Sequence, residues 1–141
     1  MKYLKYYENI DPFEDVWEDE EMEFFGQKKV EIDQPGDLSD IILWDGIKEI
    51  RFSNEDITKL PDLPDSIEYL GCSFTNIFFL PKLPKLLECL YCYHTKISFL
   101  SELPKSLEYL FCSFTNIKEI PKKFYDKQDR YWLRINKVKK I

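Results

Sequence analysis

Residues 60–77 read LPDLPDSIEYLGCSFTNI, and the same pattern returns twice, each time displaced by 20 residues. Residues 80–97 read LPKLPKLLECLYCYHTKI, and residues 100–117 read LSELPKSLEYLFCSFTNI. A shorter copy of the strand portion, IKEIRFSNEDI, occupies residues 47–57. Self-similarity at a fixed short period is the signature of a repeat architecture, in which each unit buries its apolar side against the next.

The repeat predicts one short strand per unit, because its apolar residues recur in register and alternate around the central leucine. The recurring positions are Ile67, Leu70, Cys72 and Ile77, then Leu87, Leu90, Cys92 and Ile97, then Leu107, Leu110, Cys112 and Ile117. The Leu-Pro-x-Leu-Pro stretch between strands cannot be helical, since proline lacks an N–H donor and pushes its predecessor toward extended geometry. We therefore expect a β-rich solenoid of parallel strands with extended or polyproline-like returns.

These repeats resemble the leucine-rich-repeat family, and most closely its shortest, 20-residue subclass with Leu-Pro-x-Leu-Pro returns. The resemblance covers about residues 47–121 and implies a right-handed coil that binds other proteins. That subclass occurs in effector proteins of Gram-negative pathogens and in giant-virus proteins. Some of those effectors carry a ubiquitin-ligase domain after the repeats; residues 122–141 are too short for one, so the resemblance is carried over for the scaffold alone.

One position departs from the family's pattern. Thr75, Thr95 and Thr115 stand where the family usually places a ladder-forming asparagine. A threonine hydroxyl can satisfy turn backbone groups, although with fewer hydrogen bonds. We expect these hydroxyls to bond within the turns.

The chain divides into four regions by composition. We expect an acidic N-terminal segment at residues 1–27, an N-terminal cap at 28–46, repeats at 47–121 and a C-terminal cap at 122–141. Within the first cap, two aliphatic runs flank Pro35-Gly36 and predict a β-hairpin. The second cap is expected to hold a polar helical turn over 122–131 and a shortened strand unit from Leu133 to Ile141.

Charge and composition restrict the class of partner. The formal net charge is −6 and the pI about 4.9, whereas a nucleic-acid binder needs a dominant basic surface. No apolar run approaches the length of a membrane span, and the first residues lack the apolar core of a signal peptide. Three cysteines in register read as stacked small hydrophobes of a reducing compartment, so we expect a cytoplasmic protein.

The outward strand positions are mostly aromatic. In each unit the residues that are not at the recurring apolar positions are expected to point away from the core. The aromatic side chains and the histidine among them are Tyr69, Phe74, Tyr91, Tyr93, His94, Tyr109, Phe111 and Phe114. Clustered exposed aromatics are typical of interface centres, and this face is the predicted partner-binding site. The alternative is that the rings pack on each other as ladders, or against the N-terminal segment.

The acidic segment Glu8–Glu23 contains nine acids, no bases, and the aromatic residues Phe13 and Trp17. Such a run reads either as a solvated tail or as a docking motif for a partner or for its own chain. Residues 118–141 have the opposite balance, with nine bases and three acids. Contact between the acidic end of one copy and the basic end of another is therefore a second expectation.

The residues that catalysis or metal binding requires are sparse. Cys89 and Cys92 have the spacing of half a zinc site, but positions three apart in a strand face opposite sides. His94 is the only histidine, and no phosphate-binding loop or cofactor pattern occurs. We expect no metal, no cofactor and no enzymatic activity.

The sequence thus favours a protein-binding module that uses its aromatic strand face. One alternative is a structural component of a virus or phage particle, suggested by the absence of alanine and the excess of lysine over arginine, which are typical of AT-rich genomes. Another is an effector or inhibitor that acts on a host.

Overall fold

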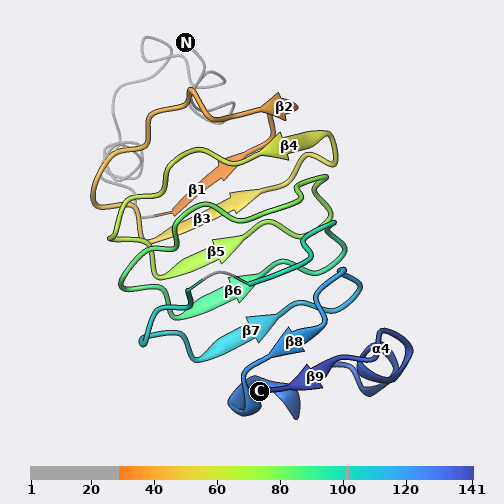
Figure 1. Ribbon diagram of the computed structural model, residues 1–141. Coiled ribbons are helices and arrows are strands. Elements are labelled where there is room, and N and C mark those ends of the chain that lie inside the picture. Colours follow the sequence, from red (N-terminus) through yellow and green to blue (C-terminus); the bar gives the residue numbers. More distant parts are fainter. Residues whose placement is uncertain (1–28, 101) are drawn as a thin grey trace, which may run out of the picture.

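The computed structural model describes residues 29–100 and 102–141, which form a parallel-strand β-solenoid with little helix. The main sheet stacks five strands in the order β1 (Lys29–Ile32), β3 (Glu49–Phe52), β5 (Tyr69–Gly71), β6 (Cys89–Tyr91) and β7 (Tyr109–Phe111). Figure 1 shows them one above another, each joined to the next by a long return. The solenoid expected from the repeat is confirmed.

Strand register follows the repeat period. Leu70 pairs with Leu90, and Leu90 with Leu110. After each strand the chain turns and bonds again to the preceding coil, as where the Lys96 N–H donates to the Ile77 carbonyl at 3.0 Å. Two pairs of short strands form after these turns, outside the main sheet. In the first, β4 (Ile57–Lys59) is parallel to β2 (Gly36–Asp37); in the second, β8 (Glu119–Ile120) is parallel to β9 (Lys139–Lys140).

The core consists of columns of equivalent side chains from successive coils. Each column is fully enclosed, because a 20-residue step returns the same position to the same side of the coil. The columns are Ile50, Leu70, Leu90 and Leu110; Ile57, Ile77, Ile97 and Ile117; Ile47, Ile67, Leu87 and Leu107; and Cys72, Cys92 and Cys112. Removal of this apolar surface from water is the main stabilising term.

The threonines act as expected. Thr75, Thr95 and Thr115 are buried, and each hydroxyl donates to the carbonyl three residues earlier at 2.7 to 2.8 Å. These bonds satisfy carbonyl groups at the strand ends, where the ladder stops and the chain turns.

The hairpin expected in residues 28–46 is wrong. Residue 28 lies outside the described residues, and β1 pairs in parallel with β3 as the first coil of the solenoid. Gly36, at φ +92°, turns the chain into β2, and Ile41 is buried outside any strand. The two aliphatic runs around Pro35-Gly36 suggested a hairpin, but the same sequence pattern arises when the chain continues round a coil instead of reversing direction.

The C-terminal cap (residues 122–141) contains α3 (Lys122–Tyr125), α4 (Arg130–Ile135) and β9. The helical turn expected over 122–131 is present in α3, but Leu133 lies in α4 and only residues 139–140 form a strand. Phe124 and Trp132 are buried, and they close the end of the core below β7. Figure 1 shows β8, β9 and α4 at the lower end of the stack.

No helix in the described part of the chain is long and apolar enough to cross a membrane.

Candidate functional site

Seven of the eight aromatic residues predicted for the binding face form one connected network, here called the strand-face site. Tyr69, Tyr91 and Phe111 lie in the strands, and Tyr93 lies just after β6. In the turns that follow lie Phe74, His94 and Phe114. These rings both point away from the core and pack on one another, so the two arrangements considered for them occur together. The turn rings are exposed, and the strand rings are half-buried by one another.

The strand row runs across three coils. The Tyr69 and Tyr91 ring centroids lie 5.1 Å apart, and Tyr91 stacks on Phe111 at 4.4 Å. The Tyr69 ring lies over Gly71 and leans toward Tyr91: a Cβ at Gly71 would lie 3.5 Å from that ring, in ordinary van der Waals contact. Gly71 is therefore buried beneath the face, although its position points outward.

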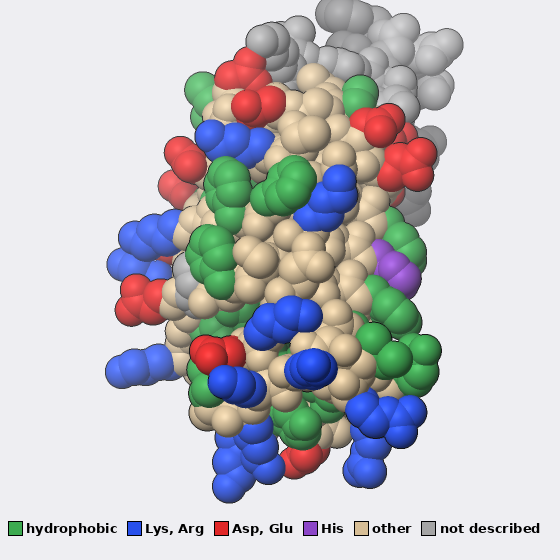
Figure 2. Space-filling view, turned by 45° about the vertical axis from the view of Figure 1, so that its right-hand side comes forward, with side chains coloured by type: hydrophobic (Ala, Val, Ile, Leu, Met, Phe, Trp, Pro, Cys, Tyr) green, Lys and Arg blue, Asp and Glu red, His purple; other side chains and the backbone are tan. Residues whose placement is uncertain are grey.

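The turn row is a stack of three rings. The His94 ring lies 4.6 Å from Phe74 and 4.5 Å from Phe114, within 12° of parallel to both. The single histidine, purple in Figure 2, sits between hydrophobic side chains at the right-hand edge of that view. Tyr93 joins the two rows, because it meets Phe74 edge-on at 5.3 Å and Tyr91 at 6.4 Å.

The turn rings are held by an uncommon backbone conformation. Phe74, His94 and Phe114 have φ of 61°, 53° and 56°, in the left-handed region that non-glycine residues rarely adopt. The Phe74 N–H donates to the Tyr93 carbonyl at 3.1 Å, and the His94 N–H donates to Ser113 at 3.0 Å. The turns at Phe74 and His94 are thus each fixed by the coil that follows.

Charged groups border the two ends of the site. The Arg51 guanidinium lies 5.3 Å from the Tyr69 ring centroid and pairs with Glu49 at 3.3 Å. At the other end the Lys127 ammonium lies 5.0 Å from the ring of Tyr109, the one predicted residue without a ring contact in the described structure. Both charges at the ends of the site therefore already have partners within the chain.

Two shallow hollows meet at Tyr69 and Tyr91. One, of about 540 Å³, extends to Phe111 and Glu88. The other, of about 330 Å³, extends to Tyr93 and Ser73. The Ser73 hydroxyl is buried and has no hydrogen-bond partner among the described residues.

Burial raises the pKa of three groups at the strand row. It raises the pKa of Tyr91 to about 12, and it raises the pKa of Tyr69 and of the Cys89 thiol. The Tyr69 and Tyr91 hydroxyls are therefore hydrogen-bond donors at neutral pH, and Cys89 is a thiol rather than a thiolate nucleophile.

In the described part of the chain no three His, Cys, Asp or Glu residues gather in a way that could hold a metal ion, and the four cysteines are free. The docking motif suggested around Phe13 and Trp17 lies outside the described residues.

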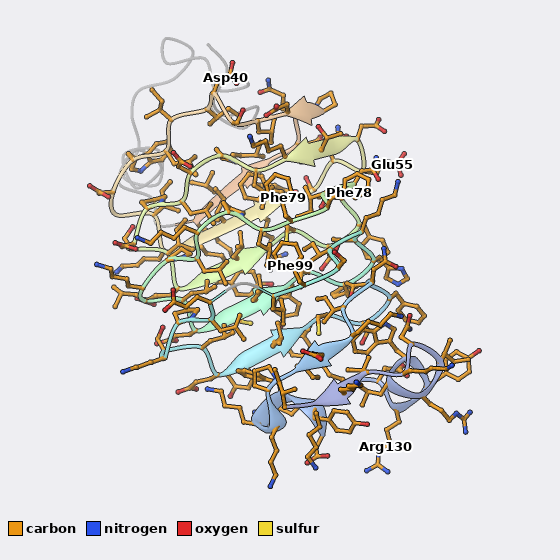
Figure 3. The ribbon with its side chains drawn as sticks, in the orientation of Figure 1. Asp40, Glu55, Phe78, Phe79, Phe99 and Arg130 are labelled. Carbon is orange, nitrogen blue, oxygen red and sulfur yellow. The ribbon has the colours of Figure 1, made fainter. Side chains whose placement is uncertain are left out.

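The sequence did not predict a second exposed aromatic group on the other side of the turn. Phe78, Phe79 and Phe99 are exposed there (Figure 3). The same two positions hold Thr58 and Lys59 in the preceding unit, and Lys118 and Glu119 in the last one. In the two middle units three of these four positions are phenylalanine, and the fourth is Ser98; this change from polar residues to aromatics was the signal in the sequence.

Comparison with known proteins gave no match: no family model, no curated protein and no solved structure is significantly similar to this chain.

Proposed function

We propose that this chain is a protein-binding module whose strand-face site holds a segment of a partner protein. The observation that supports this proposal is the connected network of rings from Tyr69 to Phe114, which is accessible and is ordered before any partner binds. Rigid aromatic side chains bury much area with little loss of rotamer freedom, and this is the property of interface hot spots.

The contacts within the site support recognition rather than catalysis. Stacking fixes the rings before any partner arrives, so less entropy is lost on binding. The tyrosine hydroxyls beside the hollows supply polar groups that would set the register of a bound segment. The leucine-rich-repeat resemblance supports the same proposal, because members of that family generally bind proteins.

The test uses matched phenylalanine substitutions on the two sides of the turn. A partner is first captured from the cells that produce the protein and is identified by mass spectrometry; its dissociation constant is then measured with purified components. Phe74→Ala should weaken binding at least tenfold, about 1.4 kcal/mol, as for a hot-spot ring. Phe78→Ala is the control, because Phe78 is 56% exposed and Phe74 is 55% exposed.

A double substitution at the centre of the strand row gives the stronger form of this test. Tyr91→Ala with Phe111→Ala should leave unfolding cooperative and reduce affinity further than Phe74→Ala. If the folded fraction of this variant binds the partner as tightly as the unaltered chain does, the rings only pack against one another and the proposal is wrong.

A further inference from the structure

The three aromatics beyond the turn belong to a larger surface, here called the return-side patch. Phe78, Phe79 and Phe99 are 56%, 44% and 59% exposed. Phe99 borders a hollow of about 410 Å³ that also includes Leu103. A second hollow, of about 570 Å³, adjoins it at Leu103 and has Leu80 and Leu83 in its wall. Contiguous exposed apolar surface of this kind marks a docking site.

The border of the patch is basic. Lys96 lies 5.2 Å from the Phe78 ring centroid and Lys118 lines the first hollow. Lys82, Lys85 and Lys105 line the second. The carboxylates lining the two hollows are Glu119 and Glu102. Figure 2 shows hydrophobic side chains on this face with blue basic side chains around them. An apolar surface ringed by lysines fits a segment that is acidic and carries aromatic anchors.

The chain itself contains such a segment. Residues 1–28 carry nine acidic and three basic residues and hence the whole net charge of −6, whereas residues 29–141 carry seventeen of each. All nine acids fall within Glu8–Glu23, and they surround Phe13 and Trp17. The described fold therefore has an apolar surface bordered by basic residues, and the sequence before it has an acidic segment with aromatic residues that complements this surface.

The connection is long enough. Phe13 is 16 residues before β1, which at roughly 3.3 Å per extended residue allows a span of about 50 Å. Phe79 follows β5, the third strand of the stack, and Phe99 follows the fourth; coils about 4.8 Å apart place them roughly 10 to 15 Å along the axis from β1. A segment tethered on the same chain acts at an effective concentration on the order of millimolar.

We propose that the acidic segment Glu8–Glu23 binds the return-side patch of its own chain, with Phe13 and Trp17 seated against Phe78, Phe79 and Phe99 and its carboxylates facing the bordering lysines. This contact lies beyond the turn from the strand-face site, and it leaves that site open to a partner.

The experiment is photo-crosslinking in the full chain. A benzoylphenylalanine at position 13 replaces one aromatic by another, and crosslinked peptides are identified by mass spectrometry from an equal mixture of light and heavy-isotope protein. We expect crosslinks to residues 78–105 within single chains, independent of protein concentration. Lys82→Glu with Lys105→Glu should lower the crosslinked fraction at least fivefold. Arg130→Glu with Arg134→Glu, an equal charge reversal on exposed residues of α4 that line neither hollow, should not.

The other outcomes overturn the proposal. Mixed light and heavy products would assign the contact to a second copy. Crosslinks to the strand-face site or to the C-terminal cap would place the segment elsewhere. A crosslinked fraction no higher than in urea would mean that the segment does not dock. Circular dichroism and cooperative unfolding of each variant show that its patch is folded, so loss of crosslinking cannot be ascribed to unfolding.

Discussion

Phe74, His94 and Phe114 adopt a backbone conformation that costs stability for any residue except glycine. The left-handed region costs an ordinary residue about 1 to 2 kcal/mol, because its Cβ crowds the following carbonyl oxygen. Glycine or asparagine would fit all three turns with less strain. The rings therefore persist for a reason other than backbone geometry, and strain of this kind is typical of functional sites.

Phe114 gives a direct test of this argument, since it ends the stack and contacts one ring. Phe114→Gly should be more stable than Phe114→Ala by about 1 kcal/mol in urea denaturation, because both remove the ring and glycine also removes the strain. Both should weaken partner binding equally. Equal stability of the two variants would mean that the turn relaxes and stores no strain.

The buried thiols are the groups with the largest pKa displacement. Burial raises the pKa of Cys72 and of Cys112 from 9.0 to about 12, and burial beside those two thiols also raises the pKa of Cys92 well above its ordinary value. In the unfolded chain the same thiols ionise near their ordinary values. Between pH 9 and 12 the native state therefore holds protons that the unfolded state has released.

This difference predicts a loss of stability in alkali. The contribution of the thiols to the free energy of unfolding is constant below about pH 8 and falls as pH rises through 9, because the unfolded state then binds fewer protons. Each thiol should contribute a slope of about 1.4 kcal/mol per pH unit. Urea denaturation from pH 7 to 10.5 measures it, and Cys72→Ala with Cys112→Ala should reduce the slope. An unchanged slope would show that the thiols are not its source.

At the scale of elements, the repeat predicted strand positions and register well, because leucine and cysteine recur at a fixed interval and only one register buries them all. The first coil was missed because residues 29–46 keep the aliphatic spacing without the Leu-Pro-x-Leu-Pro return. A short aliphatic run such as Val30 to Ile32 predicts a strand but not whether it pairs in parallel or antiparallel. That depends on the neighbouring strand, which for β1 is the parallel strand β3.

The outer edge of β7 shows what the sequence could not reveal. No further coil follows, so its backbone groups would be left without partners. The side chain of Gln128 replaces the missing strand: its amide donates to the Leu110 carbonyl, and its oxygen accepts from the Cys112 N–H at 3.3 Å. The Lys123 ammonium donates to the Leu107 carbonyl at 2.8 Å. No sequence pattern distinguishes a glutamine that caps a sheet edge from one on a polar surface.

Gln128→Leu should therefore destabilise the whole chain. The substitution keeps the volume but leaves a buried N–H and a buried carbonyl without partners, at about 1 to 3 kcal/mol each. Urea denaturation should show a lower midpoint with cooperative unfolding retained. Arg134→Leu, on an exposed position of α4, is the control and should change stability by less than about 0.5 kcal/mol. Similar midpoints for the two variants would contradict the capping role.

At the scale of the whole molecule, the sequence predicted which aromatic side chains point away from the core but not which rings contact one another. Alternation fixes the side of the sheet, whereas ring contacts depend on neighbouring coils, as in the lean of Tyr69 over Gly71 toward Tyr91. The return-side patch was missed because alternation was counted along the strands only. Phe78 and Phe79 follow a turn, where strand periodicity no longer applies.

A repeat protein built in this way should tolerate loss of one complete unit. Deleting residues 81–100 joins Leu80 to residue 101, the same junction that Leu100 makes, so the columns, the 20-residue step and the C-terminal cap are kept. Stability in such arrays is a sum of units and their interfaces, so unfolding should stay cooperative with a urea m-value lower by about one sixth, since m scales with the surface exposed. Partner binding should be lost, because the deletion removes Tyr91, Tyr93 and His94.

A ten-residue deletion is the control. Deleting residues 81–90 removes half as much chain but breaks the 20-residue period, and it should abolish cooperative unfolding. If the ten-residue deletion folds as well as the twenty-residue one, the coils are not held in register by their repeated columns.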